Sequence, residues 1–71
     1  MGDNMTNTKL LLEAIKRSGL KKEWISRQLN ITATALHMKM TNKTEFKASE
    51  IIKLTKVLFL TKKQRDDIFL S

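Results

Sequence analysis

The stretch that decides the fold runs from Gly19 to Asn42 and reads GLKKEWISRQLNITATALHMKMTN. In its first half, the spacing of the apolar residues is typical of one face of a helix. These residues are Leu20, Trp24, Ile25 and Leu29. Asn30 interrupts the pattern, and asparagine tolerates a left-handed backbone at little steric cost. We therefore predict a helix over residues 21–29 that ends in a tight turn at Asn30.

A second helix is predicted after this turn, over residues 33–40. Ile31 offers an apolar plug for the turn, and Thr32 is a favourable N-cap residue. The inward side of the helix would carry Ala35, Leu36 and Met40. Two helices joined by a turn of about four residues, with the outer face of the second one free, form a helix-turn-helix. This arrangement places a recognition helix in the major groove of DNA.

The segment from Gly19 to Thr32 resembles the helix-turn-helix of the Cro-type, phage-repressor-like regulators, whose usual pattern is Gly-Leu-Thr-Gln-x-x-Leu-Ala-x-x-Leu-Gly-Ile-Ser. The later segment Phe-Lys-Ala-Ser-Glu-Ile-Ile-Lys-Leu, residues 46–54, is similar to the helix after the motif in small switch proteins of temperate phages of Gram-positive bacteria. The likeness covers nearly the whole chain after Thr6. The chain departs from the pattern at Lys22, Ser26 and Asn30.

The resemblance implies an all-α, lambda-repressor-like fold, with a single compact domain of about five helices around a helix-turn-helix at residues 20–41. It implies that the outward face of the 33–40 helix reads bases. The family's motif places Ala33, Thr34, His37 and Met38 there. In the family, the loop after this helix lies along the DNA backbone. The residues expected to contact phosphates are Lys22, Lys39, Thr41, Lys43 and Lys47.

Composition supports a nucleic-acid partner and argues against catalysis. The formal charge is +7, from 14 Lys and Arg against 7 Asp and Glu, and such a balance favours a polyanion such as double-stranded DNA. A chain of 71 residues has room for one modest core and no enzyme cleft. His37 is the only histidine and there is no cysteine, so we expect no enzyme, no metal and no cofactor.

The chain shows neither a signal peptide nor an apolar run long enough for a membrane span. Together with the absence of cysteine, this predicts a cytoplasmic protein with no membrane partner. The resemblance would place it in a bacterial host cytoplasm.

Three further helices complete the predicted domain, which covers residues 8–71 after a flexible polar leader of residues 1–7. The first runs from Thr8 to Ser18, with Leu10 partly off its apolar face. That face is formed by Leu11, Leu12, Ala14 and Ile15. The others are predicted over 48–58, after a loop anchored by Phe46, and over 62–69, after a capping box that begins at Thr61.

Apolar side chains in two places are candidates for protein contacts. Trp24 would either cover the edge of the core, stack on a sugar or face a partner. Ile68, Phe69 and Leu70 cannot all face one core from one helix, so at least one should be exposed for dimerisation or partner binding. The alternative is that they close the core and fray. Met38 completes the set of partner candidates.

Two functions remain open at this point. The strongest base contacts are made by Arg or Lys on guanine and by Asn or Gln on adenine, at ~1–3 kcal/mol each, and none of these types stands at the first outward positions. The chain is therefore either a DNA-binding regulator of a temperate phage switch, expected to bind a pseudo-palindromic site as a homodimer, or an antirepressor that binds the phage repressor. Steep salt dependence would distinguish DNA binding from an apolar protein interface.

Overall fold

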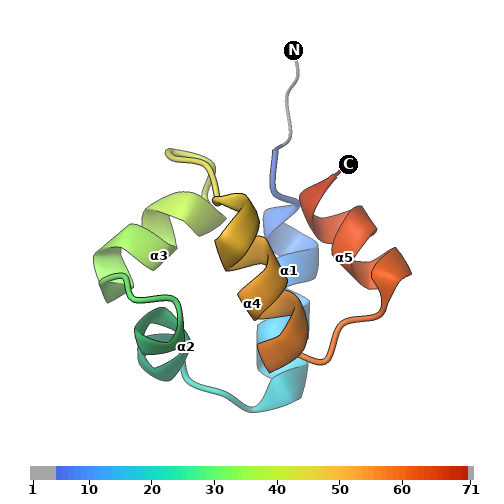
Figure 1. Ribbon diagram of the computed structural model, residues 1–71, viewed down its shortest axis with the longest axis horizontal. Helices are drawn as coiled ribbons and strands as arrows, with labels where there is room; N and C mark the ends of the chain where they lie inside the picture. Colours follow the sequence, from blue (N-terminus) through green and yellow to red (C-terminus); the bar gives the residue numbers. More distant parts are fainter. Residues whose placement is uncertain (1–4, 71) are drawn as a thin grey trace.

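Five helices account for most of the chain in the computed structural model, which describes residues 5–70. They are α1 (Thr8–Ser18), α2 (Lys22–Gln28), α3 (Ala33–Met40), α4 (Ala48–Val57) and α5 (Lys62–Phe69). No strand occurs in these residues, so the all-α prediction is confirmed. In Figure 1, α1 lies behind α4, with α2 and α3 on one side of this pair and α5 on the other.

The helix ends follow from local chemistry in the sequence. Asn7 and Thr32 cap α1 and α3 by accepting hydrogen bonds from the backbone N–H groups of Leu10 and Ala35. Thr61 begins the predicted capping box of α5, in which its N–H donates to the Gln64 side chain at 2.8 Å. Left-handed residues follow the ends of four helices: Gly19 (φ 74°), Asn30 (φ 59°), Asn42 (φ 67°) and Phe59 (φ 54°).

The core lies where the five helices meet. Each of the five helices contributes one of the largest fully buried side chains: Leu11, Ile25, Leu36, Leu54 and Phe69. Phe46 packs against this core with its ring edge-on to Phe69, at 5.5 Å between centroids, so it anchors the loop after α3 as predicted. Leu12 was expected on the inward face of α1 but is 40% exposed, because its neighbour Leu11 takes the core-facing position.

The folded domain begins earlier than the predicted boundary at residue 8. The Thr6 backbone exchanges two hydrogen bonds with the Asn42 side chain, of 2.8 and 2.9 Å, and Thr6 is buried. The Asn7 N–H donates to the Ile68 carbonyl at 2.6 Å. Thr6 and Asn7 therefore belong to the domain rather than to a flexible leader. Of the rest of the predicted leader, Met5 is 60% exposed, and residues 1–4 lie outside the described residues, as does Ser71.

Candidate nucleic-acid interface

The turn between α2 and α3 spans residues 29–32, which is the length that a helix-turn-helix requires. Asn30 adopts the left-handed conformation, and the N–H of Ile31 donates back to the Ser26 carbonyl at 3.0 Å. Ile31 is half-buried and packs against the core, as its predicted role as a plug requires. These contacts fix where α3 begins, so its inward side is set by Leu36 and Met40, which are 1% and 2% exposed.

The opposite side of α3 faces solvent. All four residues that the motif places in base-reading positions are exposed: Ala33, Thr34, His37 and Met38. Figure 1 shows α3 at the edge of the bundle, on the side opposite α5. The structure therefore brings the four side chains together on one accessible helical face, which offers one hydroxyl, one imidazole, one thioether and one methyl group.

Four of the five candidate phosphate-contacting residues are also exposed: Lys22, Thr41, Lys43 and Lys47. They come from the start of α2, the end of α3 and the loop that leads to α4. This loop folds back on α3, since the N–H of Lys43 donates to the Met38 carbonyl at 2.9 Å. The backbone of Lys43 is thereby held beside the C-terminal end of α3.

Lys39, the fifth candidate, does not fit the expected role. Its Nζ lies 2.8 Å from Glu50 Oε1 and donates to the Glu45 carbonyl at 3.2 Å, and only 11% of the side chain is exposed. The ammonium also lies 6.0 Å from the centre of the Phe46 ring. Lys39 therefore fastens α3 to the start of α4 and is not available for a phosphate. The position of Lys39 in the motif does not predict this ion pair, because Glu50 lies 11 residues further along the chain.

Glu50 completes this buried pair and also caps α4. Its carboxylate accepts a second hydrogen bond, from the Lys47 N–H, at 2.8 Å. Burial alone would raise the pKa of Glu50, but the hydrogen bonds from Lys39 and the Lys47 backbone, with the positive charges of both lysines, lower the pKa below its ordinary value. Lys47 has no acceptor atom in its side chain, so only this half of a capping box forms and its ammonium remains in solvent.

The candidate partner residues divide into two groups. Ile68 and Phe69 are 3% and 2% exposed, so the prediction that they form a contact surface is wrong. They close the core beside α1, leaving Leu70 as the exposed member of the terminal trio, at 56%. Trp24 and Met38 are 39% and 36% exposed, so part of each side chain is accessible to a partner while most of its surface is covered.

Sequence reasoning missed the most exposed apolar side chain among the described residues, Phe59, at 90%. It lies in the apolar run Leu58–Leu60 between α4 and α5, for which no exposed side chain was predicted. Its positive φ of 54° turns it outward while Leu58 is buried. A left-handed phenylalanine leaves no signal in the sequence, because this conformation is expected of Gly or Asn.

Two other kinds of feature are not found within residues 5–70. No group of three or more His, Cys, Asp or Glu side chains in this range is placed to hold a metal ion. None of the described helices is long and apolar enough to cross a membrane. No protein-family model matches the chain, and neither curated proteins nor solved structures show a significant match.

Proposed function

We propose that this protein is a helix-turn-helix transcriptional regulator of a temperate phage or prophage switch, which binds operator DNA through α3. The observation that carries the proposal is the exposed outer face of α3, held by the Asn30 turn and flanked by cationic side chains. With a formal charge of +7, the chain attracts a polyanion through counterion release. In this account Lys22, Lys43 and Lys47 hold phosphates.

Sequence readout in this account rests on few groups. Thr34 and His37 supply the hydrogen-bonding atoms, and Ala33 and Met38 contact thymine methyl groups. Since no Arg, Lys, Asn or Gln occupies these four positions, specificity is modest per contact and needs two half-sites. A homodimer on a pseudo-palindromic site would provide them.

The test is a fluorescence-anisotropy titration against DNA from the protein's own promoter region and against unrelated DNA of equal length. The double variant Thr34→Ala/His37→Ala should reduce the preference for promoter DNA by about 10- to 100-fold, while binding to unrelated DNA changes little. Lys16→Gln, a change to an exposed side chain on α1 outside α3, serves as the control. An unchanged preference in the double variant would exclude readout by these side chains.

A second function is favoured by one specific observation. The only cation on α3 is taken by Glu50, and the exposed surface near the motif includes the apolar side chains of Trp24 and Met38. Such a face is better suited to contact another protein than to read bases. In this alternative the chain is an antirepressor that binds the phage repressor and masks or alters the DNA surface of that protein.

The alternative is tested by titrating the repressor encoded beside this protein into the labelled chain. Met38→Ala and Trp24→Ala should each weaken that complex by about tenfold or more, as expected for central apolar contacts. Ile52→Ala, a change to a 57% exposed side chain on α4, is the matched control. If no complex forms, or if the control weakens it equally, the antirepressor function is excluded.

A further inference from the structure

Phe59 combines two unfavourable features that a structural role does not explain. Its ring is 90% exposed, and its φ of 54° lies in the left-handed region that L side chains other than Asn and Asp rarely adopt. The corresponding positions after α1, α2 and α3 are occupied by Gly19, Asn30 and Asn42. Among the described residues, Phe59 is thus the one left-handed residue that is neither Gly nor Asn. Its ring is also hardly buried in the monomer.

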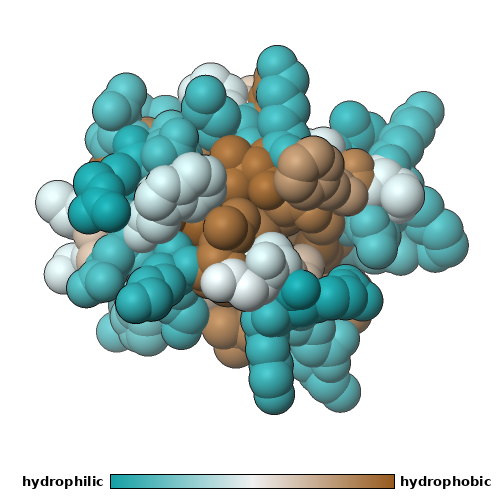
Figure 2. All heavy atoms as spheres, turned by 90° about the horizontal axis from the view of Figure 1, so that it is seen from below, coloured by the Kyte–Doolittle hydropathy of each residue, from teal (hydrophilic) through white to brown (hydrophobic). Residues whose placement is uncertain are grey.

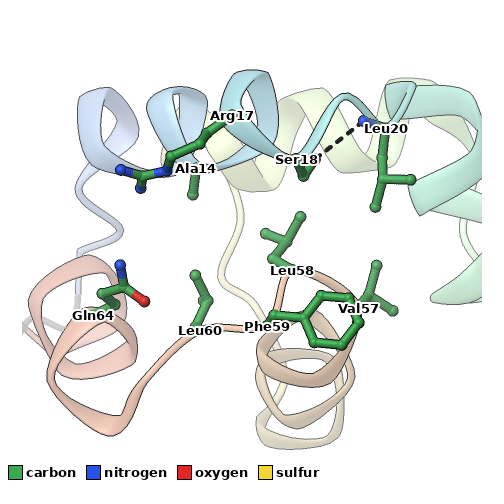
Figure 3. A pocket seen from close by; sticks show the side chains of 9 residues that line it. All are labelled: Ala14, Arg17, Ser18, Leu20, Val57, Leu58, Phe59, Leu60 and Gln64. Atoms are coloured by element: carbon green, nitrogen blue, oxygen red, sulfur yellow. Dashed lines mark hydrogen bonds between the residues drawn. The ribbon is translucent and has the colours of Figure 1, made fainter.

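The ring stands at the rim of an open apolar hollow of about 320 Å³. Figure 3 shows that the hollow separates the end of α1 from the loop between α4 and α5. Its apolar lining consists of Ala14, Leu20, Val57, Leu58 and Leu60. Apolar cavities of ~150 Å³ accommodate benzene, so this hollow has room for a phenyl ring. Figure 2 views this end of the molecule and shows apolar side chains gathered in one region with hydrophilic side chains around it.

The charged side chains near the hollow differ in sign, unlike the lysine-rich remainder of the surface, and only Arg17 lines the hollow itself. Arg17 borders both this hollow and an adjoining one, which Glu13 and Asp67 also line. Asp67 in turn pairs with Lys63 at 2.9 Å. The charged residues that line the two adjoining hollows are therefore one cation, Arg17, and two carboxylates, Glu13 and Asp67. A second copy of a protein with a charge of +7 can approach here without the repulsion that it would meet at a lysine-rich face.

We propose that this face is the homodimer interface, in which Phe59 of each copy enters the hollow of the other. A projecting ring and a receiving hollow on the same face are self-complementary, as a two-fold interface requires. Opposite charges at the rim, Arg17 on one copy and Glu13 or Asp67 on the other, meet across the same axis. No residue of α3 lines the hollow, so the dimer leaves both recognition helices accessible. The proposal does not depend on DNA binding.

Sedimentation equilibrium of the full chain without DNA, over a wide concentration range, tests the interface. The wild-type chain should associate to a dimer, and Phe59→Asn should raise the dissociation constant by at least about tenfold, because each interface loses two buried rings. Asparagine suits the left-handed backbone, so this variant should unfold at the same or a higher temperature when both chains are diluted to monomers. Loss of the dimer will then not reflect loss of the fold.

Two further variants complete the test. Arg17→Glu should weaken the dimer by several-fold through like charges at the rim, and Ile52→Ala, which removes exposed apolar surface on α4 outside the hollow, should leave it unchanged. A wild-type chain that remains monomeric at all concentrations would overturn the proposal, as would a dimer that Phe59→Asn leaves intact. The proposal would also be overturned if the chain stays monomeric and the NMR signals of Phe59 shift only when the neighbouring repressor is added. That result would assign the hollow to the repressor.

Discussion

Lys39 Nζ lies 2.8 Å from Glu50 Oε1, and the two side chains are only 11% and 8% exposed. The pair joins α3 to the first turn of α4. Glu50 also accepts a hydrogen bond from the Lys47 N–H, so one carboxylate holds a side chain and a helix end together. This pair helps to fix the orientation of α3 relative to the rest of the domain. Lys39 therefore has a structural role that the exposed lysines do not have.

The stability of the domain should be sensitive to Glu50. Glu50→Ala leaves the Lys39 ammonium buried without its partner and removes the cap of α4, so we expect a loss of about 2–4 kcal/mol in the free energy of unfolding. Lys63→Ala breaks an exposed pair with Asp67 and should cost less than about 0.5 kcal/mol. Urea unfolding followed by circular dichroism measures both. Equal losses would contradict a specific role for the buried pair.

The same carboxylate should make stability depend on pH. The folded-state pKa of Glu50 lies below its ordinary value of 4.5, so its contribution is fully present above that value and is lost as the pH falls through the lowered pKa. Wild type should therefore be more stable than Glu50→Gln at neutral pH, with a difference that shrinks below pH 4.5. Urea unfolding across the acid range measures this, with the exposed Glu23→Gln as control. A difference independent of pH would contradict the account.

Asn30 and Asn42 should respond differently to replacement by glycine. Both are left-handed, so glycine fits either backbone. Asn30→Gly should change the free energy of unfolding by less than about 1 kcal/mol. Asn42→Gly also removes both hydrogen bonds to the Thr6 backbone and should cost about 1–2 kcal/mol. Amide hydrogen exchange should show loss of protection at the Thr6 N–H in the second variant only. Retained protection there would show that other contacts hold this segment.

Exposed and buried lysines should be distinguishable in DNA binding. Lys43→Gln should lower the salt dependence of binding by about one phosphate contact, without affecting stability. Lys39→Gln should instead destabilise the domain, and the salt dependence should not change once the protein is confirmed to be folded. Anisotropy titrations at several salt concentrations, together with thermal unfolding, provide the comparison. A reduced salt slope in Lys39→Gln alone would show that Lys39 leaves Glu50 to bind a phosphate.

Local signals in the sequence were sufficient to predict the helices. The bounds of α3 and α5 agree with the prediction because Thr32 and Thr61 are strong N-caps and because Asn42 can end a helix in the left-handed conformation. The exposed face of α3 follows from the same register, since burying Leu36 and Met40 turns Thr34 and His37 outward.

Contacts between distant segments were not predictable in this way. The Lys39–Glu50 pair and the bridge from Asn42 to Thr6 depend on how helices pack, which helical periodicity does not encode. The terminal residues Ile68, Phe69 and Leu70 show the same limit. The pattern required at least one of them to be exposed but did not indicate which one. Leu70 is that residue, and the more prominent apolar surface lies instead at Phe59.

The measurement that tests the central claim most directly is a titration of the purified protein against its own promoter DNA at low and moderate salt, with and without the neighbouring repressor. A DNA-binding regulator should bind by itself, prefer promoter DNA over unrelated DNA, and lose affinity steeply as salt increases. Weak, unselective binding at low salt, together with an altered repressor–DNA complex, would contradict this account and show that the helix-turn-helix binds another protein.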